Sequence, residues 1–192
     1  MVTTLITLIE AKLELGITDS DSDTLLSTLI DAVISIFEDE IDRKLESAGY
    51  IEYYSSEGNE SCIFLKNRPV TEITSIYDDP DWDFDVSDLL SSDDYTYNAD
   101  NGIVYYNGQF FKGFNSIKVK YTAGYTQTTL PKSIKQCLIR QMAVWYKDAK
   151  GAEWAKSVVS QPGGGTITKK ELKNNLLPDF ISLTEKYRDW HC

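Results

Sequence analysis

The hydrophobic pattern of this chain changes its period twice, and each change marks a boundary in the fold. Up to about Gly49 the apolar residues recur every three to four positions, which is typical of amphipathic helices. Residues 50–127 instead contain short β-branched and aromatic segments separated by turns. From Pro131 onward the helical period returns. The sequence therefore predicts an α+β protein: a mainly α-helical bundle with an inserted small antiparallel β lobe.

Two helices are expected before the β lobe. The first spans 8–15, because Thr7 and Glu10 have the spacing of a capping box and Gly16 can end the helix. The second spans 24–46, and its apolar residues cover a wider arc than a simple surface helix needs. We expect this helix to bury one flank within its own fold and the other against the β lobe or a neighbouring subunit.

A third amphipathic helix is expected over 131–150. Pro131 suits the first helical turn, since its missing N–H costs nothing there, and Gly151 suits a left-handed cap. The apolar face of this helix and that of the second should together form the core of the bundle. The side chains expected to be buried are Leu29, Val33, Phe37, Leu138, Met142 and Trp145.

Six strands are expected in the β lobe. They are Tyr50–Tyr54, Cys62–Leu65, Val70–Tyr77, Tyr95–Tyr97, Ile103–Tyr106 and Ser116–Thr122. Turn signals rich in Gly, Asn, Asp and Pro separate them. The segment 78–94 contains eight aspartates and no lysine or arginine, so we expect an exposed, mobile loop there.

Residues 160–192 are expected to be a flexible C-terminal segment with a short helix, set apart from a domain formed by residues 1–159. Pro162 and Gly163–Gly165 break regular structure at its start. The short helix, 178–190, carries an apolar stripe that something must cover. The sequence leaves two alternatives for what covers this stripe: the bundle of the same subunit, or a partner.

The net charge of −11 is unevenly distributed. Residues 1–130 contain 24 acidic and 8 basic residues, whereas residues 131–192 contain 6 acidic and 11 basic residues. An acidic body repels nucleic acid, which argues against sequence-independent DNA binding. The basic third could contact an acidic partner surface, including the acidic half of another copy; the alternative is a pair of solvated faces.

No motif in the sequence favours catalysis, a cofactor or a metal ion. Two aspartate series begin like a calcium loop: Asp19, Asp21 and Asp23, and Asp79, Asp81 and Asp83. Both lack the glycine at position six and the glutamate at position twelve that such a loop requires. The only histidine, His191, is too close to the end of the sequence for a rigid nucleophilic site. We therefore expect no enzyme activity, no cofactor and no metal.

The cysteine pattern and the hydropathy bear on the compartment. Cys62, Cys137 and Cys192 are odd in number and far apart, which gives neither a disulfide framework nor a metal-binding spacing. A reducing compartment is expected. The opening residues lack a basic, apolar leader, and no apolar run approaches the roughly 18 residues of a membrane helix. We expect no membrane association.

Several stretches, taken in order, resemble the head–tail connector (adaptor, head-completion) proteins of tailed bacteriophages. The opening of that family is similar to TLITLIEAKLELGITDSDSDTLLSTLIDAVISIFEDEI, and its β segment to LKNRPVTEITSIYDD. The closest match is IKVKYTAGYTQTTLPKSIKQCLIRQMAVWYKDAKG, and LLPDFISLTEKYRDW resembles the family's end more loosely. The chain departs from the family pattern at 148–150, where an arginine commonly precedes the glycine, and in its longer acidic loop.

The resemblance implies a structural protein of the virion, located at the head–tail junction and made in the host cytoplasm. Connectors of this kind form a ring between the portal protein and the tail, extend the DNA channel, and offer a docking surface to a stopper or tail-completion protein. The ring would contain about twelve copies if it follows the symmetry of a portal. A monomer in isolation is compatible with this, and the genomic DNA only passes through the channel.

A closed ring needs a heterologous interface, in which one patch meets a different patch on the next copy. We expect the subunit or portal interface on the second helix and the C-terminal helix. The candidate residues are Phe37, Ile41, Phe180, Leu183, Tyr187, Arg188 and Trp190. The alternative function is a non-catalytic protein-binding adaptor module that uses its β lobe.

Overall fold

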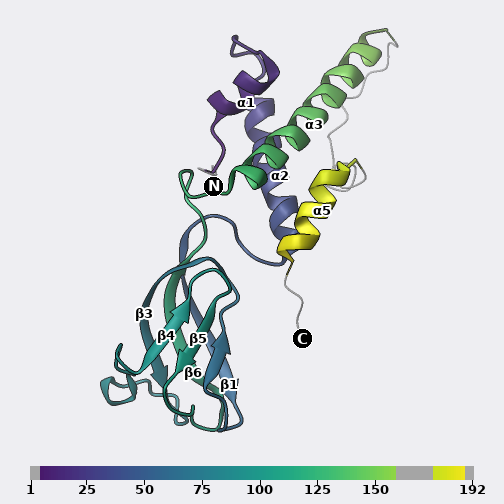
Figure 1. Cartoon of the computed structure of the whole chain (residues 1–192). Helices are drawn as coiled ribbons and strands as arrows, with labels where there is room; N and C mark the ends of the chain where they lie inside the picture. Colours follow the sequence, from purple (N-terminus) through teal and green to yellow (C-terminus); the bar gives the residue numbers. More distant parts are fainter. Residues whose placement is uncertain (1–4, 159–174, 189–192) are drawn as a thin grey trace. The chain divides into compact units, whose positions relative to one another are not determined.

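The computed structural model describes the backbone of residues 5–158 and 175–188 and, apart from residues 152–158, their side chains. The chain divides into two compact units. A helical unit is formed from residues 1–43 and 126–192, and a β unit from residues 44–125 (Figure 1). No helix among the described residues has the length and apolar character that crossing a membrane requires.

The helical unit contains four helices among its described residues. They are α1 (Leu8–Leu15), α2 (Asp23–Ile41), α3 (Lys132–Val158) and α5 (Pro178–Tyr187). The capping box predicted for α1 is present, because the Thr7 hydroxyl accepts a hydrogen bond from the Glu10 N–H and the Glu10 carboxylate accepts one from the Thr7 N–H. Gly16 ends α1 in the left-handed conformation, with φ of 68°.

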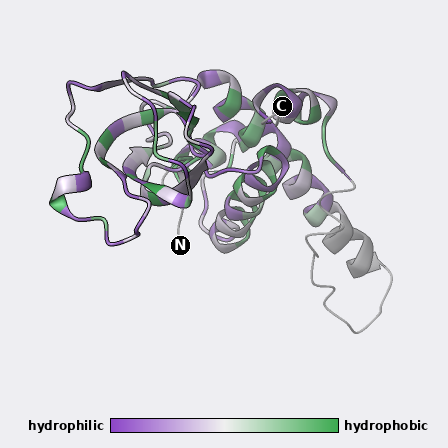
Figure 2. Cartoon of the chain, turned by 90° about the horizontal axis from the view of Figure 1, so that it is seen from below, coloured by the Kyte–Doolittle hydropathy of each residue, from purple (hydrophilic) through white to green (hydrophobic). Residues whose placement is uncertain are grey.

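The core of the helical unit lies between α2 and the other three helices. α2 contacts α1, α3 and α5, and all six side chains predicted to be buried are buried. The hydropathy colouring of Figure 2 shows green apolar positions along the helices and purple hydrophilic stretches in the loops. The wide apolar arc of α2 therefore has its cover within the same subunit, and no neighbouring copy is needed to explain it.

The C-terminal helix α5 supplies part of that cover. Phe180 is fully buried, and its ring meets the ring of Phe37 edge-on, with centroids 5.4 Å apart. The chain just before α5 is fixed by the buried side chain of Gln141, which donates to the Asn175 carbonyl and accepts from the Leu177 N–H. Of the two covers left open by the sequence, α5 thus uses its own subunit.

The C-terminal ends of α2 and α3 differ from the expected ones. α2 ends at Ile41 rather than at residue 46, because Asp42 adopts the left-handed conformation with φ of 53°. Leu45 is buried, but it lies after the end of the helix. α3 continues through Gly151 to Val158, so that glycine is not a cap. A glycine marks a helix end only where the backbone takes positive φ, and Gly151 remains helical.

The β unit contains two three-stranded antiparallel sheets (Figure 1). One has the order β1-β6-β3 and the other the order β2-β5-β4. The strands are β1 (Ala48–Ser56), β2 (Cys62–Phe64), β3 (Val70–Asp78), β4 (Tyr95–Asn98), β5 (Ile103–Tyr106) and β6 (Gly113–Ala123). All six predicted strands are present, and a short 3-10 helix, η1 (Val86–Asp88), lies in the acidic segment.

The two sheets enclose a core of their own. Along the central strand β6, Ile117, Val119 and Tyr121 are buried, whereas Lys118 and Lys120 between them are half-buried on the other face. The second sheet contributes the buried side chains of β2 and β5, which pair through Ile63 and Val104. β6 therefore has one buried face and one half-buried face.

The predicted fold class, a mainly α-helical bundle with a small inserted β lobe, is wrong. The β unit is a compact body with two sheets and a separate hydrophobic core, and the helical unit contains four described helices. The error has a physical cause. Each short strand carries little hydrophobic signal by itself, and only pairing between strands distant in sequence reveals how much apolar surface the segment buries.

Candidate interaction surfaces

Three of the predicted interface residues lie inside the subunit. Phe37 and Ile41 on α2 and Phe180 on α5 are all fully buried in the core of the helical unit. In this conformation they offer no surface to a portal or to another copy. Their apolar character is explained by the packing of α5 on α2.

The remaining predicted residues lie along α5 and just after it. Leu183 and Tyr187 are half-buried and Arg188 is exposed, whereas Trp190 lies outside the described residues. The Arg188 guanidinium donates to the Glu40 backbone carbonyl at 3.0 Å and contacts the Glu40 carboxylate at 3.4 Å. An interface role for Leu183, Tyr187 and Arg188 stays a prediction.

An apolar pair is exposed on α1. Ile9 and Leu13 are 78% and 81% exposed, and their spacing of four residues places them on one face of the helix. An ion pair between Glu10 and Lys135 joins α1 to α3. Burial opposes ionisation of the Glu10 carboxyl, but the hydrogen bonds from Lys135 and Thr7 and the Lys135 charge together outweigh it and hold the pKa of Glu10 below its usual value.

Several exposed aromatic side chains are on the β unit. Trp82, Phe111 and Phe114 are 58%, 61% and 73% exposed. The Trp82 indole N–H donates a hydrogen bond of 2.7 Å to the Phe114 carbonyl, which joins the loop after β3 to the turn at the start of β6. We call these three residues the aromatic tip. Exposed aromatic clusters of this kind are typical of protein-binding surfaces.

Two buried aspartates hold the aromatic tip in place. The Asp79 carboxylate accepts hydrogen bonds of 2.7 Å from the N–H groups of Asp81 and Phe84, and the bond from Phe84 is the main reason that its pKa is lowered. The Asp78 carboxylate accepts a hydrogen bond of 3.0 Å from the Phe111 N–H. Burial raises the pKa of Asp78, because the charged form is poorly solvated there.

The loop after β3 has an unusual backbone. Trp82 and Phe84 have φ angles of 67° and 51°, a left-handed conformation that bulky residues rarely adopt. Such a conformation costs on the order of 1–3 kcal/mol and persists only where the surroundings enforce it. Here Phe84 packs beside the rings of Tyr53 and Tyr77, and the Lys118 ammonium lies 4.7 Å from its ring centroid. Trp82 is thereby fixed facing solvent.

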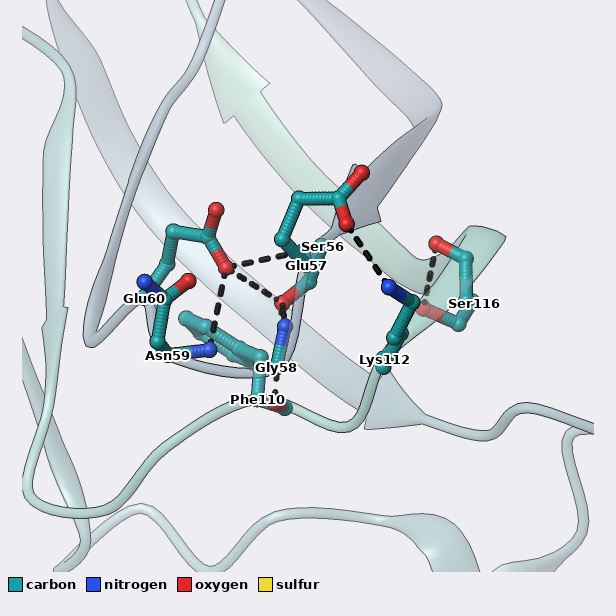
Figure 3. Close-up of polar contacts among 9 residues, drawn as sticks. Ser56, Glu57, Gly58, Asn59, Glu60, Phe110, Lys112 and Ser116 are labelled. Atoms are coloured by element: carbon teal, nitrogen blue, oxygen red, sulfur yellow. Dashed lines mark hydrogen bonds and ion pairs between the residues drawn. The ribbon is translucent and has the colours of Figure 1, made fainter.

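Next to the aromatic tip, a polar network orders the turn after β1 (Figure 3). The Glu60 carboxylate accepts hydrogen bonds from the Ser56 hydroxyl at 2.8 Å and the Glu57 N–H at 2.9 Å, and the Ser56 bond is the main reason that its pKa is lowered. Glu57 forms an ion pair of 2.9 Å with Lys112. The adjoining pocket measures about 160 Å³, well below the roughly 300 Å³ at which small-molecule sites begin.

One cluster of three carboxylates is a candidate for metal binding. Asp79, Asp83 and Asp88 place oxygen atoms within 4.8 Å of one another. Partial loss of hydration beside its neighbours and the Asp79 charge raise the pKa of the exposed Asp83, while the Asp79 oxygens already accept two backbone N–H bonds. These contacts explain the arrangement without an ion, and the expectation of no calcium site stays a prediction.

The sequence-based expectation missed the aromatic tip. It treated residues 78–94 as a mobile loop, whereas hydrogen bonds to Asp78 and Asp79, the helix η1 and a bridge between Tyr77 and Leu89 fix this segment at several points. The available signal was the sequence DPDWDFD, in which aromatic residues alternate with aspartates. Exposed tryptophan and phenylalanine side chains do not help a loop to stay soluble, so their presence indicates an interaction surface.

Comparison with known proteins gives one family and a set of similar structures. The family model described as head completion protein matches residues 4–189. A chain in the neck of an empty GTA particle, computed with C6 symmetry, is similar with a TM-score of 0.64 and 15% identity, covering 100% of this chain and 94% of that one. No curated protein matches the sequence.

Two further structures have the same fold. One is a chain in the neck of a native GTA particle computed with C12 symmetry, with a TM-score of 0.62, 16% identity, and coverage of 100% of this chain and 93% of that one. The other belongs to the virion of a native gene transfer agent (GTA) particle, with a TM-score of 0.59, 17% identity, and coverage of 98% and 92%. At these identities the likeness shows a shared fold over the whole chain.

Proposed function

The chain belongs to the head completion protein family, and from this premise we propose that it forms a ring between the portal protein and the tail of a phage-like particle. It is a structural protein of the virion, placed at the head–tail junction. The family match carries the proposal, because it extends over residues 4–189 and so includes both units. Within the ring, each subunit would line an extension of the DNA channel and offer a docking surface to a stopper or tail-completion protein.

The charge distribution supports passage of DNA rather than its capture. The β unit, residues 44–125, contains 14 acidic and 6 basic residues. A channel wall with excess negative charge repels the phosphate backbone and lets the genome slide past. The similar neck structures were computed with C6 and C12 symmetry, which supports a closed ring of about twelve copies.

The aromatic tip supports a role in docking rather than chemistry. Its three exposed rings suit protein contact, and the adjoining pocket is too small for a typical substrate. We therefore propose a non-catalytic protein. A free-standing adaptor that uses its β unit in the host would also fit the tip, but it would not explain a family match over nearly the whole chain.

Electron cryo-microscopy of the particle neck tests the proposal. We expect a ring of density at the head–tail junction that accommodates both units of this chain. Deleting the gene should leave DNA-filled heads that cannot retain tails, and adding the purified protein to those heads should restore tail attachment. Normal tailed particles without this protein would contradict the proposal.

A further inference from the structure

The aromatic tip is exposed, rigid and surrounded by negative charge, so its partner must be both basic and able to contact aromatic rings. The segment 78–94 that supplies Trp82 contains eight aspartates and no basic residue. Asp81 and Asp83 flank Trp82 directly, and both are exposed. A surface of lysine and arginine side chains satisfies both requirements, because these cations pair with carboxylates and also lie over aromatic faces.

Such a surface exists on the helical unit of the same chain. At about 100° per residue, Lys132, Arg140, Lys147 and Lys150 fall on one face of α3, and all four are exposed. The stripe extends over about 27 Å of helix. The opposite face of α3 carries the buried residues Ile134, Leu138 and Trp145, so the rest of the helical unit packs on that side. We call these four residues the α3 stripe.

From this complementarity we propose that the aromatic tip of one copy docks on the α3 stripe of the next copy in the ring. The proposal rests on the proposed function, because it presupposes a ring. It supplies what a closed ring needs, namely two different patches that each recur once per subunit. Trp82, Phe111 and Phe114 would bury apolar area at the centre of the contact, with carboxylate–lysine pairs around them.

The packing of Phe84 explains how the tip can act as a preformed contact. Because the positive-φ backbone of Trp82 and Phe84 is already fixed by Asp79 and by the rings of Tyr53 and Tyr77, little conformational freedom is lost on docking. The strain is accounted for if the loop must present Trp82 to a second molecule.

Crosslinking in assembled particles tests which surface the tip contacts. Heads that lack this protein would be completed with an equal mixture of ¹⁴N-labelled and ¹⁵N-labelled protein carrying the photoreactive substitution Phe114→p-benzoylphenylalanine. We expect crosslinks to peptides from 132–150 that join a light copy to a heavy copy. The same substitution at Phe64, another well-exposed aromatic residue, on β2, is the matched control and should give no such link.

The outcomes separate this proposal from the proposed function. Crosslinks to a different protein, crosslinks within single copies only, or no crosslink in particles that contain the protein would overturn the docking proposal and leave the ring assignment standing. Failure of the purified protein to enter the heads at all would instead contradict the proposed function, on which the docking depends.

Charge reversal provides a second, independent test of the docking proposal. The variants Lys132→Glu/Lys147→Glu and Asp81→Lys/Asp83→Lys change exposed side chains. Their melting temperatures are measured first, because Asp83 also lies beside the Asp79 carboxylate, and only variants that fold are compared. Each should lower incorporation into heads at least tenfold, and combining all four changes should restore most of it. If the combined variant is as defective as the worse of the two parents, the tip and the α3 stripe do not meet.

Discussion

Leu138 and Leu13 show how differently one residue type behaves in the two environments of the helical unit. Leu138 is fully buried on α3, whereas Leu13 on α1 is 81% exposed. Leu138→Ala should lower the free energy of unfolding of the helical unit by about 2–5 kcal/mol, because it leaves a cavity in the core. Leu13→Ala should change it by less than about 0.5 kcal/mol. Urea unfolding followed by circular dichroism measures both; equal losses would show that the packing of α3 is misassigned.

Asp78 makes stability depend on pH in a direction that can be checked. Burial raises its pKa above the usual 3.8, so its contribution to stability is fully present below that value and is lost as the pH rises through the raised pKa. Asp78→Asn keeps an oxygen that can accept the Phe111 N–H but cannot ionise. The variant should therefore gain in melting temperature relative to the wild type as the pH rises from about 3 to 7. A constant difference across that range would contradict this prediction.

For the aromatic tip, the sequence predicts the exposure of the loop but not its backbone conformation. Aspartate excess predicted exposure of the loop, which is correct for Asp81 and Asp83. The left-handed backbone of Trp82 and Phe84 was not predictable, because aromatic residues rarely take positive φ unless tertiary contacts impose it. Those contacts come from three separate strands, and no local pattern records them.

At the scale of elements, local signals predicted well and long-range ones predicted poorly. Six strands and the capped start of α1 follow from alternation and capping, both of which act within a few residues. The second flank of α2 could not be assigned from sequence, because its cover, α5, lies some 140 positions further along the chain. The prediction of a flexible segment at 160–192 is not tested, because residues 160–174 and 189–192 lie outside the described part of the chain.

The packing of α5 leads to an element-scale prediction. Removing residues 175–192 exposes Phe37 and leaves the buried amide of Gln141 without its partners at Asn175 and Leu177. The melting temperature of the helical unit should fall by several degrees. Ile181→Ala, which alters an exposed side chain of the same helix, is the control and should have little effect. If the truncated protein melts like the wild type, α5 contributes little to the core and is available to a partner.

At the scale of the whole molecule, the family predicted from the sequence is confirmed, although the predicted balance between helix and sheet is wrong. The two results are compatible, because the resemblance depended on the order of short motifs and the fold class on how much apolar surface each part buries. A fold tolerates many substitutions as long as the pattern and volume of its buried apolar residues are kept. A chain with 15–17% identity to neck proteins can therefore have their fold over its whole length.

The β unit should fold by itself, because its two chain ends are joined within it. The Tyr125 N–H donates to the Leu45 carbonyl at 2.7 Å, and the Ser47 N–H donates to the Tyr125 carbonyl at 2.9 Å. A fragment of residues 44–125 therefore contains its own core and both sheets and does not need the helices to hold its two ends together.

We expect this fragment to be monomeric, with dispersed amide resonances and a single cooperative thermal transition. Its indole resonance should report the Trp82 hydrogen bond to Phe114, since Trp82 is the only tryptophan in the fragment. A fragment that stays unfolded would show that the β unit depends on the helical unit, and the intact chain should then melt in one transition rather than two.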